Sequence, residues 1–291
     1  MFYTLAELSA LGAEVRLGVI GNPIAHSKSP QMQQAALDEA GLPYRYVRLL
    51  ADTAGNAFEQ LLAALATRGF AGVNVTVPFK KRAFAAAVQA DALSTLCGAA
   101  NTLVLKEDGW HCHNTDGPGF ERAILELSGR SLADMRVVLL GACGGAGSAL
   151  AAQCALSHCR GLTLVNRPRP ELAELAHTLA PHYHGQIATC HFGTTELQQA
   201  VAEADLIVNA TSLGLKEGDP LPLPADWLRP DRIVYDIVTH ATPLQQAAAQ
   251  RGCTASDGLE MLLWQGAIAF EHWFGQLPAV DTMRQALRRG N

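Results

Sequence analysis

Three turns carry polar residues whose types could do chemistry. Lys80 ends the apolar stretch GVNVTVPFK, Asn101 lies in the small-residue turn GAANTL, and Asp116 lies in the glycine-containing turn HNTDGPG. Polar groups held on turns between apolar strands suit ligand binding. Pro78 cannot continue a central strand, so Lys80 should emerge at the carboxyl edge of a parallel sheet, where open α/β sheets bind ligands. The alternative interpretation is that Lys80 is a solvated lysine at the start of a helix.

A glycine-rich turn forms a second candidate site. In VVLLGACGGAGSAL, glycines stand between an apolar strand and an Ala-rich helix. Glycines there let the backbone turn tightly, and the N–H groups at the helix start attract a pyrophosphate. The spacing G-x-x-G-G-x-G departs from the strict dinucleotide fingerprint, so a tight structural turn without a ligand stays an alternative. The residues of this turn predicted to contact a dinucleotide are Gly141, Ala142, Cys143, Gly144, Gly145 and Ala146.

The next strand should end at the adenosine ribose of such a dinucleotide. It ends in NRPRPE, where Asn166, Arg167 and Arg169 are candidate contacts. The arginines could hold a 2′-phosphate or stack on adenine, whereas Glu171 would repel a phosphate. A solvated basic turn is the alternative interpretation.

The hydrophobic pattern predicts two series of α/β elements. In the first, three strands alternate with three helices, which implies a parallel sheet with helical crossovers. The predicted strands are 17–21, 44–50 and 71–77, and the helices are 30–41, 57–69 and 80–91. The second series begins over 135–159 with a strand, the glycine turn and a helix, followed by a strand at 161–166 and a helix at 169–180. Its further strands are 204–211 and 231–238. A long helix is predicted at 256–275, and a short one after Pro278.

We therefore predict an α/β protein with two domains. An N-terminal α/β substrate domain spans 1–116, and a Rossmann-type dinucleotide-binding domain spans 117–256. The C-terminal helices of 257–291 are expected to fold back on the first domain and complete it.

Composition limits the classes of function. Hydrophobic residues make up 49% of the 291 residues and charged residues 17%, with a net charge of -5, which excludes a disordered chain and disfavours nucleic acid as a partner. The start of the sequence lacks a basic segment followed by an apolar core, and no window of 18 residues is continuously apolar, so no membrane association is predicted. Seven scattered cysteines form no C-x-x-C pair and suit a reducing cytoplasm. We expect a cytoplasmic monomer or homodimer that acts on a small molecule.

The sequence HCH (111–113) is a weak candidate metal site. In a strand, His111 and His113 share one face while Cys112 points to the other, and no further ligands cluster nearby in the sequence. No metal is predicted.

Taken together, the motifs resemble those of the shikimate dehydrogenase family. They occur in the family's order over nearly the whole chain, with the glycine turn between the fourth and the fifth: AHSKSP (25–30), NVTVPFK (74–80), GAANTL (98–103), NTDGPG (114–119), NATSLG (209–214) and GLEMLLWQGAIAFEHWFG (258–275). The resemblance implies interconversion of shikimate and 3-dehydroshikimate with NAD or NADP, as in the chorismate pathway of aromatic amino acid biosynthesis.

The resemblance also implies roles for individual residues. Ser27 and Ser29 resemble the pair that binds the substrate carboxylate, and Lys80 with Asp116 resembles the catalytic pair. The residues that resemble ligands of the ring hydroxyls are Thr76, Asn101 and Gln265, with Lys80 and Asp116 also near the substrate. The further cofactor contacts that it implies are Thr211, Ser212, Leu213, Ile237, Gly258 and Met261.

Two departures from the family pattern leave alternatives open. Thr239 stands where the family usually has a tyrosine, which leaves the choice of substrate open. Quinate or a related cyclic hydroxy acid stays an alternative substrate, although the presence of both Ser27 and Ser29 favours shikimate. Pro168 and Glu171 stand where NADP-dependent relatives have a threonine and a basic residue, which favours NAD while allowing both cofactors. A non-catalytic sensor of dinucleotide or shikimate is a further alternative, although a pure binding protein would not need both Lys80 and Asp116.

Overall fold

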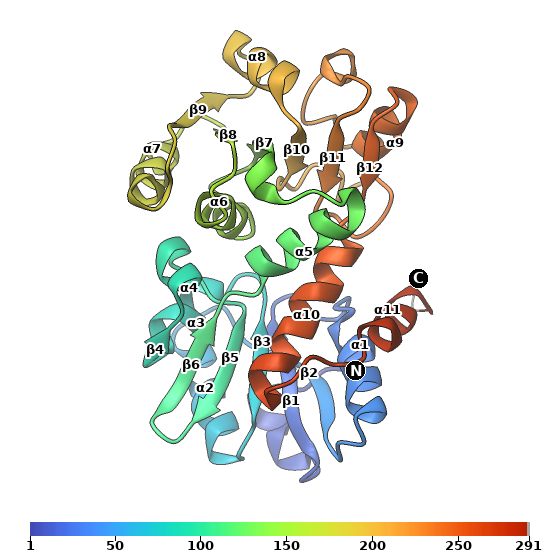
Figure 1. Cartoon of the computed structure of the whole chain (residues 1–291). Helices are drawn as coiled ribbons and strands as arrows, with labels where there is room; N and C mark the ends of the chain where they lie inside the picture. Colours follow the sequence, from blue (N-terminus) through green and yellow to red (C-terminus); the bar gives the residue numbers. More distant parts are fainter. Residues whose placement is uncertain (290–291) are drawn as a thin grey trace. The chain divides into compact units, whose positions relative to one another are not determined.

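The computed structural model describes residues 1–289 and divides into two compact units (Figure 1). The first unit contains Met1–Thr115 and the chain from Leu263 onward, and the second contains Asp116–Leu262. The chain passes from one unit to the other at two places, after Thr115 and inside a long C-terminal helix.

The first unit is built on a six-stranded sheet. Its strands are β1 (Val15–Gly21), β2 (Arg45–Leu50), β3 (Gly72–Val75), β4 (Gln89–Ala90), β5 (Thr102–Lys106) and β6 (Gly109–His113), in the order β2-β1-β3-β5-β6-β4. Its first helices are α1 (Ser29–Glu39), α2 (Ala57–Thr67), α3 (Lys80–Ala86) and α4 (Ala92–Cys97), with a 3-10 helix at Leu5–Ala10. Strands β1, β2 and β3 are parallel, as the alternation of strands and helices predicted. The buried core of this unit includes Phe58 and Leu61 of α2, Val73 of β3, and Phe79, whose ring stacks on that of Phe58.

The rest of this sheet corrects the prediction of a purely parallel sheet. Strand β5 runs antiparallel to β3, and β6 runs antiparallel to β5. A two-residue turn joins β5 to β6, and Lys106 pairs with Gly109, whose φ is 134°. So short a connection can join only antiparallel strands. The predicted helix at 80–91 ends early because the Val88 N–H donates to the Trp110 carbonyl and draws the chain into the sheet.

The C-terminal helices return to the first unit, as predicted. They are α10 (Leu259–Phe274) and α11 (Val280–Arg289). Gln33 of α1 donates to the carbonyl of Gly266 in α10 at 2.8 Å, Trp273 donates to the carbonyl of Leu103 at 3.1 Å, and α11 packs on α1. Asp257 caps the start of α10 by accepting the Leu259 N–H.

The second unit has a parallel six-stranded sheet, in the strand order of dinucleotide-binding folds. Its strands are β7 (Arg136–Leu140), β8 (Gly161–Asn166), β9 (Ile187–His191), β10 (Leu206–Asn209), β11 (Ile233–Asp236) and β12 (Thr254–Ser256), in the order β12-β11-β10-β7-β8-β9. Its helices are α5 (Asp116–Ser128), α6 (Gly147–Leu156), α7 (Pro170–Leu179), α8 (Thr195–Glu203) and α9 (Pro243–Gln250), with 3-10 helices at Leu132–Asp134, Ala180–His182 and Ala225–Trp227. The Rossmann-type architecture predicted for this region is thus confirmed.

Edge strands β9 and β12 and helices α5, α8 and α9 were not foreseen. Both strands lie at edges of the sheet, and within β9 only Cys190 is buried, so neither produces an apolar run. Among the described residues, no helix is both long and apolar enough to cross a membrane.

Candidate functional site

A buried network of polar side chains lies in the first unit, and Asn101 is at its centre. Asn101 Nδ2 donates to Thr115 Oγ1 at 3.0 Å and to Gln265 Oε1 at 3.4 Å, while Asn101 Oδ1 accepts the Thr115 N–H at 2.8 Å. The backbone on either side is also fixed, because the Asn101 N–H donates to the His113 carbonyl. These bonds bring together the GAANTL turn, the end of β6 and helix α10. Two residues expected to bind substrate hydroxyls, Asn101 and Gln265, are therefore neighbours.

The network extends to strand β2 through two residues that sequence reasoning left without a role. Asn74 Nδ2 donates to Thr102 Oγ1 at 3.0 Å, and Tyr46 Oη donates to Asn74 Oδ1 at 2.8 Å. Burial raises the pKa of Tyr46 well above its ordinary value, whereas a hydrogen bond with the Ser29 side chain and the Arg48 charge act in the opposite direction. The phenol is therefore a neutral donor at physiological pH. We call Tyr46, Asn74, Asn101, Thr102, Thr115 and Gln265 the polar cluster.

The predicted serine pair lies where β1 leads into α1. Ser29 is the first residue of α1 and is buried, and Ser27 is two residues earlier. The Ser29 N–H donates to Ser27 Oγ at 3.3 Å, so the two residues form one compact turn. A pair of hydroxyl groups at the start of an 11-residue helix is well suited to an anion.

Thr76 and Lys80 follow β3, at the same carboxyl edge as the serine turn. The Thr76 N–H donates to the Ile20 carbonyl in β1 at 2.8 Å, and the Phe79 N–H donates to the Thr76 carbonyl at 3.0 Å. Lys80 is the first residue of α3 and is half-buried. Its carbonyl accepts the Ala100 N–H at 2.9 Å, which ties its backbone to the turn that carries Asn101.

Asp116 begins the second unit as the first residue of α5. It is buried and directly follows Thr115, the residue bonded to Asn101. Its predicted role as partner of Lys80 stays a prediction.

In the second unit, the glycine turn joins β7 to α6. Gly141 has a φ of 83°, and a Cβ there would lie 2.8 Å from the Ala210 carbonyl oxygen, so the turn itself requires this glycine. A Cβ on Gly147 would lie 2.2 Å from the Gly141 carbonyl oxygen. Gly145, by contrast, is exposed and faces open space. In the described structure no side chain caps α6, which leaves its first N–H groups suited to an anion.

A pocket of about 600 Å³ lies beside this turn. Eight of the predicted cofactor contacts line it: Gly141, Gly144, Asn166, Arg167, Arg169, Thr211, Ser212 and Leu213. Four lining residues were not predicted: Phe192, Ala210, Leu221 and Pro222. Hydrophobic side chains on loops leave a weak sequence signal, which is why these four were missed.

The other seven predicted cofactor contacts do not line this pocket. Ala142 is buried in the core, and Cys143, Gly145 and Ala146 lie on the exposed or half-exposed part of the turn. Ile237, Gly258 and Met261 come together after β11, where a Cβ on Gly258 would lie 2.2 Å from the Ile237 carbonyl oxygen. The Met261 N–H donates to Tyr235 Oη at 3.2 Å.

Of the three charged residues near the expected ribose position, the two arginines line the pocket and the glutamate does not. Arg167 and Arg169 line the pocket and are exposed, whereas Glu171, in the first turn of α7, is not among the residues that line it in the described chain. Asn166 is buried, and its Oδ1 accepts the Arg167 N–H at 2.9 Å, which holds the turn in place.

A buried carboxylate organises the loops after β10 and β11. Asn209 Nδ2 and Thr242 Oγ1 both donate to Asp236 Oδ2, at 3.1 and 2.8 Å. Asn209 Oδ1 in turn accepts the Thr211 hydroxyl at 2.7 Å, so this network holds the pocket-lining loop. Burial raises the pKa of Asp236, while hydrogen bonds from the Val238 N–H, Asn209 and Thr242 oppose that rise.

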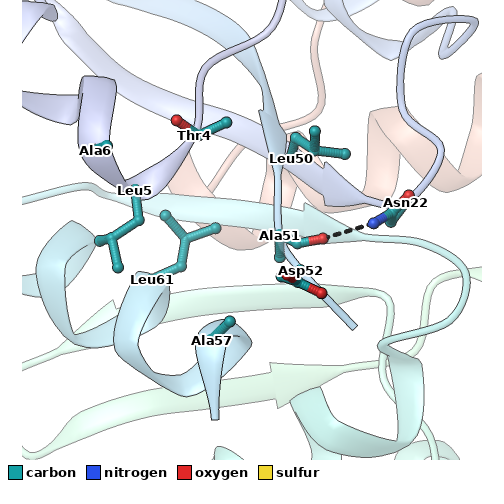
Figure 2. Close-up of a pocket in the computed structure, with 9 residues that line it drawn as sticks. All are labelled: Thr4, Leu5, Ala6, Asn22, Leu50, Ala51, Asp52, Ala57 and Leu61. Carbon is teal, nitrogen blue, oxygen red and sulfur yellow. Dashed lines mark hydrogen bonds between the residues drawn. The ribbon is translucent and has the colours of Figure 1, made fainter. Parts of the chain in front are cut away.

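A separate pocket of about 420 Å³ lies in the first unit (Figure 2). Figure 2 shows leucine side chains facing it, and Asn22 Nδ2 donating to the Ala51 carbonyl at 2.9 Å at its edge. It is lined by Thr4, Leu5, Ala6, Asn22, Leu50, Ala51, Asp52, Ala57 and Leu61, none of which was predicted to be functional.

The HCH sequence lies on β6 with the alternation predicted for a strand. Cys112 is fully buried, and burial raises the pKa of its thiol to about 11, while His111 and His113 are half-buried on the other face. The His113 ring stacks on His272 with ring centroids 3.9 Å apart. Among the described residues, no group of three or more potential ligands could hold a metal ion.

The parallel sheet, its glycine turn and the pocket beside that turn define the second unit as a dinucleotide-binding α/β unit, joined in one chain to an α/β unit with a polar cluster. Residues 19–103 match the family model described as the shikimate dehydrogenase substrate binding domain, and residues 258–288 match the shikimate 5′-dehydrogenase C-terminal domain. A shikimate dehydrogenase (NADP(+)) of Moorella thermoacetica is 38% identical over 275 residues, which cover 94% of this chain and 92% of that protein. The chain belongs to the shikimate dehydrogenase family.

Solved structures agree with this assignment. Shikimate 5-dehydrogenase from Listeria monocytogenes, in complex with shikimate and NAD, superposes with a TM-score of 0.86 and 31% identity, covering 95% of this chain and 98% of that one. Quinate dehydrogenase from Corynebacterium glutamicum, in complex with NAD, has a TM-score of 0.83 and 29% identity, covering 95% of this chain and 99% of that one. The protein is an NAD(P)-dependent oxidoreductase, as the motifs predicted. The relatives support the use of NAD(P), but they do not support the predicted preference for NAD.

Proposed function

We propose that this enzyme interconverts shikimate and 3-dehydroshikimate. The observation that carries the proposal is the buried contact of Asn101 with Thr115 and Gln265 in the unit that also carries Lys80 and the serine pair. A ring with several hydroxyl groups needs converging amide and hydroxyl partners, and a carboxylate needs donors. The names of the curated relatives support the same substrate.

The proposed roles follow the chemistry of oxidising a secondary alcohol. Ser27 and Ser29 bind the substrate carboxylate, while Thr76, Asn101 and Gln265 bind ring hydroxyls. In the direction of oxidation, an uncharged Lys80 amine accepts the hydroxyl proton; in the direction of reduction, its ammonium returns that proton to the carbonyl oxygen. Asp116 orients the Lys80 side chain and contacts the same hydroxyl. The glycine turn and the pocket beside it would hold NAD(P), which would supply hydride chemistry when bound.

The residues of the second unit fit a dinucleotide. The exposed glycines Gly144 and Gly145, next to the uncapped start of α6, suit a pyrophosphate, and Arg167 and Arg169 suit the adenosine end. We further propose that NAD is the better cofactor and that NADP is also accepted, since the Glu171 carboxylate opposes a 2′-phosphate. Arg167 and Arg169 would instead attract a 2′-phosphate. The ratio of kcat/KM with NAD to kcat/KM with NADP therefore decides which cofactor is preferred.

The proposed binding roles of the two domains follow the predicted domain boundaries. Residues 1–116 with 257–291 bind the substrate, and residues 117–256 bind the dinucleotide. This proposal is supported by the two compact units, which divide the chain between Thr115 and Asp116 and after Leu262. Location in the cytoplasm and a monomeric or dimeric state stay predictions.

Absorbance of the reduced nicotinamide tests the function directly. The purified protein is mixed with shikimate, quinate or related cyclic hydroxy acids and with either NAD or NADP, and NAD(P)H formation is followed. Quinate is the second candidate substrate because Thr239 replaces the usual tyrosine, and a higher kcat/KM for quinate would replace shikimate as the assignment. Binding without turnover of any acid in the panel would instead identify a sensor.

A further inference from the structure

Strand β2 carries two polar residues that hold the serine pair from one side. Tyr46 and Arg48 are two positions apart and so project from the same face of the strand. The Arg48 side chain is half-buried, and its Nη2 and Nε both donate to the Ser27 carbonyl, at 2.6 and 3.2 Å. Arg48 therefore fixes the backbone of the first serine.

Tyr46 is linked to the second serine through its side chain. The Ser29 side chain lowers the pKa that burial raises in the phenol of Tyr46, and this phenol donates to Asn74 Oδ1 at 2.8 Å. Through Asn74 and Thr102, it connects the serine turn to Asn101. A change at Tyr46 would therefore reach both the expected carboxylate ligands and the expected hydroxyl ligands.

The backbone of β2 is itself anchored to the helix that begins at Ser29. Gln34 Oε1 accepts the Tyr46 N–H at 3.1 Å, and Gln34 Nε2 donates to the Tyr44 carbonyl at 3.2 Å. These bonds fix the edge strand β2 against α1, so the backbone that carries Tyr46 and Arg48 is held in place.

We propose that Arg48 and Tyr46 are positioning residues for the serine pair, and that the Arg48 charge makes this pair selective for a substrate anion. The inference rests on the proposed role of Ser27 and Ser29 in binding a carboxylate. A guanidinium group stays charged at all physiological pH values. In a protein of net charge -5, a fixed cation bonded to the serine turn supplies local attraction for an anionic ligand.

The test compares an acid with its neutral ester. Kinetics are measured with shikimate and with methyl shikimate for the wild type and for Arg48→Met, Arg48→Lys and Tyr46→Phe. Arg48→Met should raise KM for shikimate about 10- to 100-fold, the range expected for a lost charged hydrogen bond, with kcat much less affected. The KM for methyl shikimate should change much less, and Arg48→Lys should recover part of the lost affinity because it restores the charge.

The matched control is Arg45→Met on the same strand. The Arg45 side chain is 60% exposed and lies 4.0 Å from Asp38, so its removal deletes the same charge away from the serine turn. Its kinetics should equal those of the wild type. Equal losses for acid and ester in Arg48→Met, or the same loss in Arg45→Met, would overturn the proposal.

Two further measurements keep the outcome interpretable. Thermal melting of each variant shows whether a loss of activity is caused by unfolding. If Tyr46→Phe or Arg48→Met folds poorly, the kinetics of Arg48→Lys test the role of the positive charge. Absence of turnover in the wild type would refute the proposed function alone. In that case, calorimetric titration of wild type and Arg48→Met with shikimate still tests the inference, and equal dissociation constants would refute it.

Discussion

The Tyr46 hydroxyl donates a 2.8 Å hydrogen bond to Asn74 Oδ1, and both side chains are buried. An unpaired acceptor in such a place costs more than the bond itself contributes, because the acceptor cannot return to water. This contact therefore supports both the stability of the first unit and the alignment of the polar cluster.

Tyr46→Phe should lower the free energy of unfolding by about 1–3 kcal/mol, the usual cost of a buried unsatisfied partner. Urea denaturation followed by circular dichroism measures the change. Tyr44→Phe is the control, since Tyr44 is half-exposed and stacks on Phe274 through its ring, which the substitution keeps. If both substitutions shift the transition equally, the Tyr46 hydroxyl has no special structural role.

Lys80→Met should reduce kcat for shikimate oxidation by about 10²–10⁴-fold, the range typical of a lost general acid or base, while the fold is retained. Steady-state kinetics and thermal melting measure the two properties. Lys81→Met provides the comparison, because Lys81 is an exposed lysine in the same helix. Near-normal turnover in folded Lys80→Met would remove Lys80 from the mechanism.

Two glycines of the β7–α6 turn should respond differently to alanine. At Gly147, a Cβ would lie 2.2 Å from a backbone oxygen, so Gly147→Ala should destabilise the second unit by about 1–3 kcal/mol, as overpacking does. A Cβ at Gly145 would face open space, so Gly145→Ala should leave the melting temperature unchanged. The same substitution should weaken NAD(P) binding. Differential scanning fluorimetry, with and without cofactor, measures both effects. Unchanged cofactor affinity in Gly145→Ala would place the pyrophosphate elsewhere.

Glu171→Gln should raise kcat/KM with NADP relative to NAD, because it removes a carboxylate near two arginines of the cofactor pocket. Glu174→Gln, on the exposed side of the same helix, should leave the ratio unchanged. The ratio is measured at saturating shikimate for each variant. An identical ratio in Glu171→Gln and wild type would show that Glu171 does not influence cofactor choice.

His272 should make the first unit less stable in acid. Burial, helped by the His113 and Lys106 charges and opposed by Asp91, lowers the pKa of His272 from 6.5 to about 4. The unfolded chain therefore binds more protons than the folded chain between these values, so the free energy of unfolding should fall as the pH drops from 6.5 to about 4. Urea denaturation across this range should show a shallower pH dependence for His272→Gln than for wild type. His182→Gln, at an exposed histidine in the other unit, should not flatten the curve.

Much of the architecture was predictable because its signals are local. Alternation of apolar runs and helices identified the parallel strands β1 to β3 and β7, β8, β10 and β11. The glycine turn needed only the residues between one strand and one helix. The β5–β6 hairpin was missed although Gly109 marks its turn, and edge strands β9 and β12 bury too little to produce a pattern.

The candidate site was predictable only in part. Lys80, Asn101 and Asp116 could be singled out because each lies on a turn beside an apolar strand, whereas Gln265 came from resemblance to the family alone. Its contact with Asn101 spans 164 positions in the sequence, and no local pattern encodes such a distance. The roles of Tyr46 and Arg48 were missed for the same reason: their partners lie on other elements.

By itself, the sequence determined the class of each element, the order of the motifs and the chemistry available at each turn, because these depend on neighbouring residues. Only the tertiary structure decided which turns meet, how β5 and β6 pair, and that β2 holds the serine pair. The direction of a buried hydrogen bond depends on strand register and helix packing between distant segments. Those relations exist only after the chain has folded.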